Sequence, residues 1–250
     1  MNAMIPLKSE KDLEMLRNSG KILAKVLEKI QGFIKPGIST AEINNLAEGL
    51  VSGENAVPAF KGYKGFPASI CTSINEEIVH GIPNGRKLKE GDIISLDLGI
   101  NYEGYFSDAA ITLPVGEVNS KKKKLIEVTK DALYEGIRQA RPENHLYDIS
   151  YSIQNYVEKN GFSVVKQFVG HGIGYSLHEE PEIPNFGMPH EGPILKYGMV
   201  FAIEPMVNMG TWESEILNNG WTAVTKDRLP SAHFEHTVAI TEKGPEILTD

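Results

Sequence analysis

Residues 92–113 contain two strand-like runs joined by a short turn, and each run carries an aspartate. Along residues 92–100, apolar residues alternate with small or polar ones at the period of a β-strand. Pairing Ile100 with Tyr105 predicts that Asp97 and Asp108 are direct cross-strand neighbours, with Cβ atoms about 5 Å apart. Two like charges in this position are destabilising unless a proton or a cation lies between them. The alternative is that Asp108 lies in an irregular stretch and both carboxylates face solvent.

Two further carboxylates lie within apolar, strand-like sequence in the second half of the chain. Glu204 interrupts the apolar run at 200–207, and Glu235 lies near the start of a run at 234–241. A buried carboxylate without a partner is strongly destabilising or becomes protonated. Four acids of this kind indicate one shared cation site. Oxygen ligands combined with an imidazole suit manganese, iron, cobalt or zinc.

Four segments have the apolar spacing of amphipathic helices, at residues 9–33, 39–50, 125–140 and 146–159. Ser9 and Ser39 each stand at a helix start with an acidic residue three positions later, which is the pattern of a capping box. The second pair of helices repeats the order of the first, because Pro36 matches Pro142 at the same offset at which Ile43 matches Ile149. We therefore expect two related halves, near residues 7–118 and 119–250, packed around one site.

The second half also contains strand-like segments, and Asn219 followed by Gly220 is a strong hairpin signal between two of them. Helices that flank antiparallel strands make the expected fold α+β. Residues 1–6 are expected to be an N-terminal extension, and residues 7–250 a single domain. The strands of this half are expected at residues 199–207, 215–217, 221–225 and 234–241.

The composition narrows the function classes. The 250 residues carry a net charge of −8, which disfavours general nucleic-acid binding, and the basic run Lys121–Lys124 is interpreted as a solvated helix start. Cys71 is the only cysteine, so an intramolecular disulfide and a cysteine-based zinc site are both excluded. The sequence shows neither a signal peptide nor an apolar run of membrane-spanning length, which predicts a cytoplasmic protein. Met4 is an alternative start to Met1.

Three histidines stand in contexts that favour a site. His171 lies between glycines at 170–174, which predicts a tight loop close to the site, and His178 follows seven residues later. His80 follows a short apolar strand into a turn. The other four histidines are predicted to be structural or surface residues; they are His145, His190, His233 and His236.

Other chemistries are not supported. The chain contains no Gly-x-Ser-x-Gly nucleophile motif, no His-Glu-x-x-His zinc motif and no Walker-type phosphate loop. Cys71 is interpreted as a small buried or pocket residue rather than a nucleophile.

These residues and their contexts resemble the type I methionine aminopeptidases, and the resemblance extends from about residue 7 to the end of the chain. It implies a pita-bread fold, in which two pseudo-symmetric halves with helices on a curved antiparallel sheet enclose a two-metal site. The matching motifs are Ser73-Ile-Asn-Glu, His80-Gly-Ile-Pro, Leu96-Asp-Leu-Gly, Gly170-His-Gly-Ile-Gly, His178-Glu-Glu-Pro, Ile203-Glu-Pro-Met and Phe234-Glu-His-Thr.

The resemblance also implies roles for individual residues. The metal ligands would be Asp97, Asp108, His171, Glu204 and Glu235, holding two divalent ions such as Fe²⁺, Mn²⁺, Co²⁺ or Zn²⁺. Glu204 would accept a proton from the attacking water and later donate it to the leaving amine. His178 would hydrogen-bond the substrate carbonyl oxygen, and His80 would contact the scissile amide nitrogen.

The same resemblance places an apolar methionine pocket beside the metals. This chain departs from many bacterial members, because Leu177 replaces a bulky aromatic residue, Phe60 replaces a smaller one, and Tyr175 replaces an arginine. In several relatives, carbonyl groups near positions matching Asn75 and Ser231 hold a monovalent cation. The expected pocket residues are Tyr63, Phe66, Cys71, Trp221, Phe60 and Leu177.

The implied activity is removal of the initiator methionine from nascent proteins with a small second residue, by a monomer that acts near the ribosome and binds neither membrane nor specific nucleic acid. One alternative is a proline-directed aminopeptidase or prolidase of the same fold. The other is a catalytically inactive, ribosome-associated binding protein. Retention of all five ligand positions argues against the inactive form.

Overall fold

The structure is a computed structural model that describes residues 5–250. The expected extension at residues 1–6 and the choice between Met1 and Met4 therefore fall largely outside the described residues. The described residues contain four α-helices and one 3₁₀ turn: α1 (Glu10–Gln31), α2 (Thr40–Gly53), α3 (Ser120–Gln139), α4 (Leu146–Lys159) and η1 (Tyr63–Gly65).

The helix starts follow from local capping. Ser9 caps α1 and Ser39 caps α2, and each forms the reciprocal capping box with the acidic residue three positions later. Helix α3 begins at Ser120, five residues before the predicted start, because the side chain of Asn119 accepts a hydrogen bond from the backbone N–H of Lys122. The basic run at 121–124 therefore forms the first turn of that helix. The predicted bounds of α4 are confirmed.

The paired strands are antiparallel and form three sheets. The central sheet has the order β1-β4-β5-β14-β9-β7-β8, with β2 paired to β4 and β15 paired to β14; the smaller sheets are β13-β10-β6 and β11-β12-β3. The strands are β1 (Val57–Pro58), β2 (Cys71–Ile74), β3 (Glu77–Val79), β4 (Ile93–Tyr102), β5 (Tyr105–Pro114), β6 (Ser163–Val164), β7 (Gly170–Gly172), β8 (Glu179–Ile183), β9 (Val200–Ile203), β10 (Met206–Asn208), β11 (Ser214–Ile216), β12 (Ala223–Thr225), β13 (Ser231–His233), β14 (Glu235–Thr241) and β15 (Gly244–Ile247).

The register of the β4–β5 hairpin differs from the prediction. Tyr102, not Ile100, pairs with Tyr105, because Glu103 and Gly104 both have positive φ and close a two-residue turn. Asp97 consequently lies opposite Ala110, and Asp108 lies opposite Gly99. The shift is two residues, so both aspartates remain on one face of the sheet as diagonal rather than direct neighbours.

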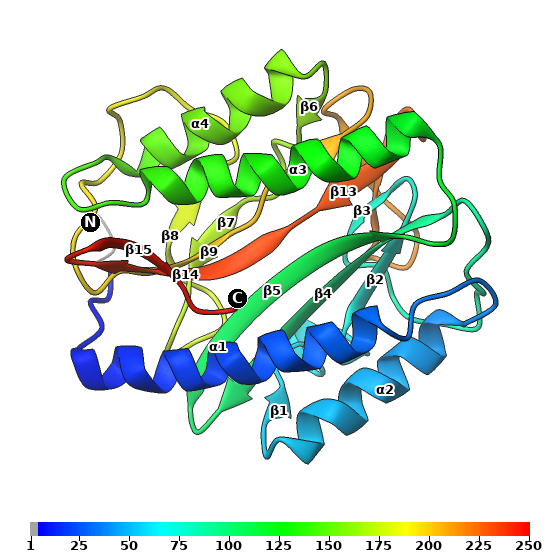
Figure 1. Cartoon of the computed structure of the whole chain (residues 1–250), viewed down its shortest axis with the longest axis horizontal. Coiled ribbons are helices and arrows are strands. Elements are labelled where there is room, and N and C mark those ends of the chain that lie inside the picture. The colour runs from blue at the N-terminus through cyan, green and yellow to red at the C-terminus, as the bar shows by residue number, and fades with distance from the viewer. Residues whose placement is uncertain (1–4) are drawn as a thin grey trace.

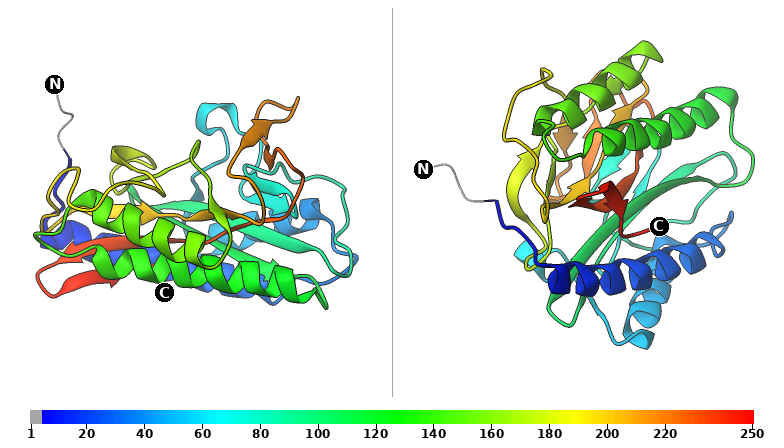
Figure 2. Two further views of the ribbon diagram at one scale, coloured as in Figure 1. Left: turned by 90° about the horizontal axis from the view of Figure 1, so that it is seen from above. Right: turned by 60° about the vertical axis from the view of Figure 1, so that its left-hand side comes forward.

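The helices cover one face of the central sheet, and the longer loops lie on the other (Figures 1 and 2). Helices α1 and α2 pack against Leu96 and Leu98 of β4, while α3 and α4 pack against Phe201 of β9 and Val238 of β14. Because side chains alternate along a strand, Asp97 must point to the opposite face. The α+β fold expected from the sequence is confirmed, whereas the division into halves near residue 118 stays a prediction.

Two further strand predictions needed correction. The run at 199–207 is not one strand, because Pro205 follows Glu204 and separates β9 from β10. His171 lies within strand β7 rather than in a loop. The hairpin predicted at Asn219 and Gly220 is confirmed by the antiparallel pairing of β11 with β12.

Within residues 5–250, none of the helices has the length and apolarity needed to span a bilayer.

Candidate metal centre

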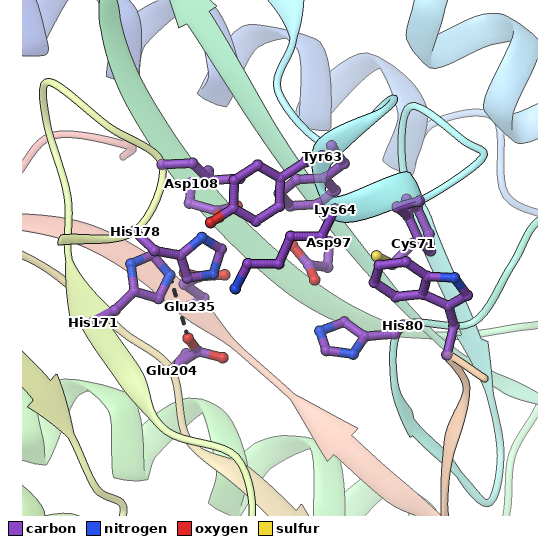
Figure 3. A pocket seen from close by; sticks show the side chains of 14 residues that line it. Tyr63, Lys64, Cys71, His80, Asp97, Asp108, His171, His178, Glu204 and Glu235 are labelled. Carbon is purple, nitrogen blue, oxygen red and sulfur yellow. Dashed lines mark ion pairs between the residues drawn. The ribbon is translucent and has the colours of Figure 1, made fainter. Parts of the chain in front are cut away.

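All five predicted ligands line one cavity of about 270 Å³ on the face of the central sheet opposite the helices (Figure 3). Asp97 comes from β4, Asp108 from β5, His171 from β7 and Glu235 from the start of β14. Glu204 occupies the break between β9 and β10. The full lining comprises Phe60, Tyr63, Lys64, Phe66, Cys71, His80, Asp97, Asp108, His171, Leu177, His178, Glu204, Trp221 and Glu235.

The strand register explains why residues so distant in sequence meet. Asp97 and Glu235 both pair with Ala110, from the strands on either side of β5. Two residues beyond Glu235, Thr237 of β14 pairs with Ala202 of β9, which in turn pairs with His171 of β7. The side chains of Asp97, Glu235 and His171 therefore lie side by side on one face.

Close packing of strand β7 accounts for the glycines around His171. A Cβ at Gly170 would lie 2.4 Å from the carbonyl oxygen of Ala202, and one at Gly172 would lie 2.1 Å from that of Glu180. The ring Nδ1 of His171 is 2.9 Å from the carbonyl oxygen of Gly172, which only accepts, so Nδ1 carries the proton. Nε2 is thus left with a lone pair, and it faces Glu204 Oε1 at 3.6 Å.

The buried carboxylates have oxygens without hydrogen-bond partners. Within residues 5–250, Oδ1 of Asp97, Oδ1 of Asp108 and Oε1 of Glu235 are all buried and unpartnered. Ligand atoms of Asp108, His171 and Glu235 lie within 4.8 Å of one another. Asp97 and Glu204 lie outside this group of three but line the same cavity. Unpaired carboxylates around an imidazole are a donor set that fits divalent metal ions.

The raised pKa values of the buried carboxylates also support a divalent metal site. Burial raises the pKa of Asp97 to about 6 and that of Glu204 to about 7. Burial, reinforced by the neighbouring carboxylates, raises the pKa values of Asp108 and Glu235 well above their usual range. Without a cation these groups take up protons more readily than ordinary carboxylates; with a cation beside them, the negative charge is favoured.

His178 and His80 flank the cavity as neutral imidazoles. The ring of His178 stacks on Tyr63 with centroids 5.1 Å apart, and lies 4.1 Å from the ring of His171. Partial burial of its ring lowers the pKa of His178 to about 3. Burial lowers the pKa of His80 to about 4, and its ring meets Phe168 edge-on. Both rings are therefore neutral at pH 7 and can donate or accept a hydrogen bond.

The other end of the cavity is apolar. Phe66 contacts Trp221 with centroids 5.1 Å apart and Phe60 at 6.5 Å, both edge-on. Phe60 and Leu177 lie against the same point of β4, because a Cβ added at Gly99 would be 2.7 Å from Phe60 Cε1 and 3.2 Å from Leu177 Cδ1. All of the predicted pocket residues line the cavity, and their binding roles stay predictions.

Sequence reasoning missed two residues at this site. His233 was assigned a structural or surface role, yet it is buried and its Nε2 lies 3.4 Å from Glu204 Oε2. Lys64 was not singled out, although it lines the cavity. The one available signal for His233 was its position two residues before Glu235. His233 supports Glu204 from behind and, like His145, His190 and His236, is not among the residues that line the cavity.

The two residues expected near a monovalent cation lie together. The backbone N–H of Ser231 donates to the carbonyl oxygen of Asn75 at 2.8 Å. The side-chain oxygen of Asn75 also accepts a hydrogen bond from Lys122. Cation binding at this point stays a prediction.

Comparison with known proteins identifies the family. A model of metallopeptidase family M24 matches residues 14–242. The chain is 52% identical over 246 residues to methionine aminopeptidase 1 of Bacillus subtilis (strain 168), covering 98% of this chain and 99% of that protein. The chain belongs to metallopeptidase family M24, among the methionine aminopeptidases.

Two solved structures resemble this chain to different degrees. The crystal structure of methionine aminopeptidase from Rickettsia prowazekii superposes with a TM-score of 0.98 at 44% identity, covering 99% of this chain and 100% of that chain. The prolidase from Pyrococcus furiosus gives a TM-score of 0.78 at 25% identity, and the match covers 98% of this chain but 65% of the prolidase. The fold is thus the expected pita-bread fold, and methionine aminopeptidase is better supported than the prolidase alternative.

Proposed function

We propose that this chain is a metal-dependent aminopeptidase that removes the N-terminal methionine of polypeptides whose second residue is small. The observation that carries the proposal is the set of unpartnered, buried carboxylate oxygens beside His171, directly adjoining an apolar pocket. A flexible thioether side chain suits such a pocket, because it fills irregular apolar space.

The five ligands would hold two divalent ions, drawn from Fe²⁺, Mn²⁺, Co²⁺ and Zn²⁺. Bound ions would supply Lewis-acid polarisation and a water of lowered pKa. Selectivity among these metals depends on their availability as well as on the ligands. The requirement for a free N-terminus would follow if the substrate α-amino group binds at this centre.

The chain's own residues provide the proton transfers. Glu204, whose carboxylate lies in the cavity beside His171, would take a proton from water and return it to the leaving amine. His178, neutral at pH 7, would donate a hydrogen bond to the substrate carbonyl oxygen as negative charge develops there. His80 lies on the opposite side of the cavity from His178, toward Trp221, and would contact the scissile amide nitrogen (Figure 3).

Release of free methionine from Met-Ala-Ser and Met-Leu-Ser peptides tests the proposal. We expect cleavage of Met-Ala-Ser that a chelator abolishes and that manganese, iron or cobalt restores, with Met-Leu-Ser spared. Failure of every metal to support release would contradict the proposal. Cleavage of Xaa-Pro peptides by the same preparation would instead favour the prolidase alternative.

The cellular setting extends the same proposal. We infer that the substrates are N-termini of nascent chains in the cytoplasm, that the enzyme acts as a monomer, and that it works close to the ribosome. The net charge of −8 favours peptide substrates over general nucleic-acid binding. Sedimentation of the purified protein, with and without ribosomes, would test both the monomer and the association.

A further inference from the structure

Lys64 is the one cationic side chain of lysine or arginine type that lines the cavity within residues 5–250. The other charged lining groups are carboxylates assigned to the metal centre. Lys64 is exposed to solvent, and Figure 3 shows its side chain extending over the cavity rather than away from it.

The backbone that carries Lys64 is fixed by a tight turn. Lys64 has φ 48° and lies between Gly62 and Gly65, which also have positive φ. The N–H of Phe66 donates to the carbonyl of Tyr63, and the N–H of Gly62 donates to the carbonyl of Phe66. The ammonium of Lys64 lies 5.4 Å from the centroid of the Tyr63 ring, which is itself stacked on His178. The turn therefore presents the charge at a defined place beside the reacting groups.

The ammonium of Lys64 has no carboxylate within ion-pair distance among residues 5–250. In the described part of the chain, Lys64 forms no ion pair, whereas the nearby Lys61 lies 2.6 Å from Glu48. Lys61 thus serves a local contact, and Lys64 remains available to a ligand. The chain as a whole carries a net charge of −8, so an unpaired cation at the cavity is not a consequence of a basic surface.

The path of a substrate brings its downstream part to this cation. In the proposed binding mode, methionine occupies the apolar end formed by Phe60, Phe66 and Trp221. The scissile bond then lies between His178 and His80. The rest of the peptide must therefore leave through the exposed opening of the cavity. We infer that the ammonium of Lys64 binds a carboxylate of the substrate downstream of the scissile bond. That carboxylate is either an acidic side chain at the third residue or the free C-terminus of a short peptide.

This inference rests on the proposed function. It adds a preference for peptides with a carboxylate downstream of the scissile bond, which the metal centre does not provide. An exposed ion pair contributes little, and salt weakens it further. We therefore expect a preference of about twofold to fivefold in kcat/KM at low ionic strength. The ratio of kcat/KM values should fall toward one at high ionic strength, because the ion pair is accessible to solvent.

Two matched peptide pairs separate the two sources of carboxylate. Met-Ala-Asp-Ser-amide against Met-Ala-Asn-Ser-amide tests the acidic side chain, and Met-Ala-Ser against Met-Ala-Ser-amide tests the free C-terminus. Each ratio of kcat/KM is measured for the wild type, for Lys64→Gln, and for Lys61→Gln as the matched control with a paired lysine. Using ratios removes any general effect of a substitution on turnover.

We expect at least one ratio to favour the carboxylate in the wild type and in Lys61→Gln, and to approach one in Lys64→Gln. The pair that responds identifies the source of the carboxylate. Methionine release with the same two ratios in Lys64→Gln as in the wild type would overturn the inference and leave the proposed function intact. Absence of release from all four peptides would overturn both.

Discussion

The ammonium of Lys8 lies 2.5 Å from Oε2 of Glu179, and both side chains are buried. Oε1 of the same carboxylate accepts the backbone N–H groups of Tyr175 at 2.6 Å and Ser176 at 3.1 Å. The ring of Tyr175 lies 4.3 Å from the ammonium. The segment before α1 thus fixes the loop that carries Leu177 and His178, although 171 positions separate Lys8 from Glu179.

We expect Lys8→Met to lower both stability and turnover. It leaves the Glu179 carboxylate buried without its partner, which costs about 3–5 kcal/mol in comparable sites. A loosened loop would also misplace His178 and reduce kcat. Urea unfolding and methionine release check the two effects. The control is Lys226→Met, whose exposed partner Glu213 lies 2.8 Å away and whose loss should cost under about 1 kcal/mol. Equal effects of both substitutions would contradict this role of Lys8.

The hairpin shows how far the sequence predicts this fold. Alternation along residues 92–113 predicts both strands and places both aspartates on one face, as observed. It does not fix the register, because Glu103 adopts a positive φ that its residue type does not favour. A two-residue turn formed with Gly104 then replaces the expected four-residue turn. The starts of α1 and α2 were predicted to within one residue because Ser9 and Ser39 provide capping boxes, whereas the Asn119 cap of α3 was not recognised.

The candidate site was predictable only in part, because some of its residues are recognisable only from contacts between distant segments. The acids stand out because a carboxylate in an apolar strand needs a partner, and this argument uses neighbours in sequence alone. His233 and Lys64 gain their significance from contacts with Glu204 and the cavity, which arise from strand order and loop position. The pairing of β14 with both β5 and β9 brings these segments together, and no local pattern encodes it.

Glu204→Gln should reduce kcat by about 100-fold to 10,000-fold, because the amide keeps the shape of the side chain but accepts no proton. The thermal unfolding midpoint should change little, since the substitution also removes a buried carboxyl group whose pKa is raised to about 7.

His171→Ala should abolish turnover for another reason, because it removes a metal ligand. Metal content measured after gel filtration should therefore fall more in His171→Ala than in Glu204→Gln. Unchanged activity in either variant would contradict the assigned roles.

Binding of Mn²⁺ should strengthen as the pH rises from 6.5 to 8. The pKa of Glu204 is about 7 in the folded chain against an ordinary 4.5, so the metal-stripped protein holds a proton there that the ion must displace. For one such proton the affinity should be about fourfold weaker at pH 6.5 than at pH 8. Isothermal titration calorimetry at both pH values checks this. Glu204→Gln is the control, because it removes the titrating group and should flatten that part of the dependence.

The same raised pKa makes the stability of the metal-stripped protein fall over this range. A carboxyl group that holds its proton more tightly in the folded than in the unfolded state stabilises the fold below its unfolded pKa, and this contribution is lost as the pH rises through about 7. His80 and His178 act in the opposite direction only below about pH 6.5, since their pKa values are lowered to about 4 and about 3. The increase in melting temperature produced by Mn²⁺ should therefore grow between pH 6.5 and 8. A constant increase would contradict the assignment of Glu204 as a ligand.

Gly99→Ala should weaken methionine binding without removing the proton-transfer groups. The added methyl would lie 2.7 Å from Phe60 Cε1 and 3.2 Å from Leu177 Cδ1, so both walls of the apolar pocket must move inward. We expect KM for Met-Ala-Ser to rise several-fold while kcat changes less, because the atoms nearest the added methyl belong to Phe60 and Leu177 and not to Glu204. Gly49→Ala is the matched control: it lies within α2 with no atom near the new Cβ, and should be neutral or slightly stabilising. An unchanged KM in Gly99→Ala would show that Phe60 and Leu177 do not bound the methionine side chain.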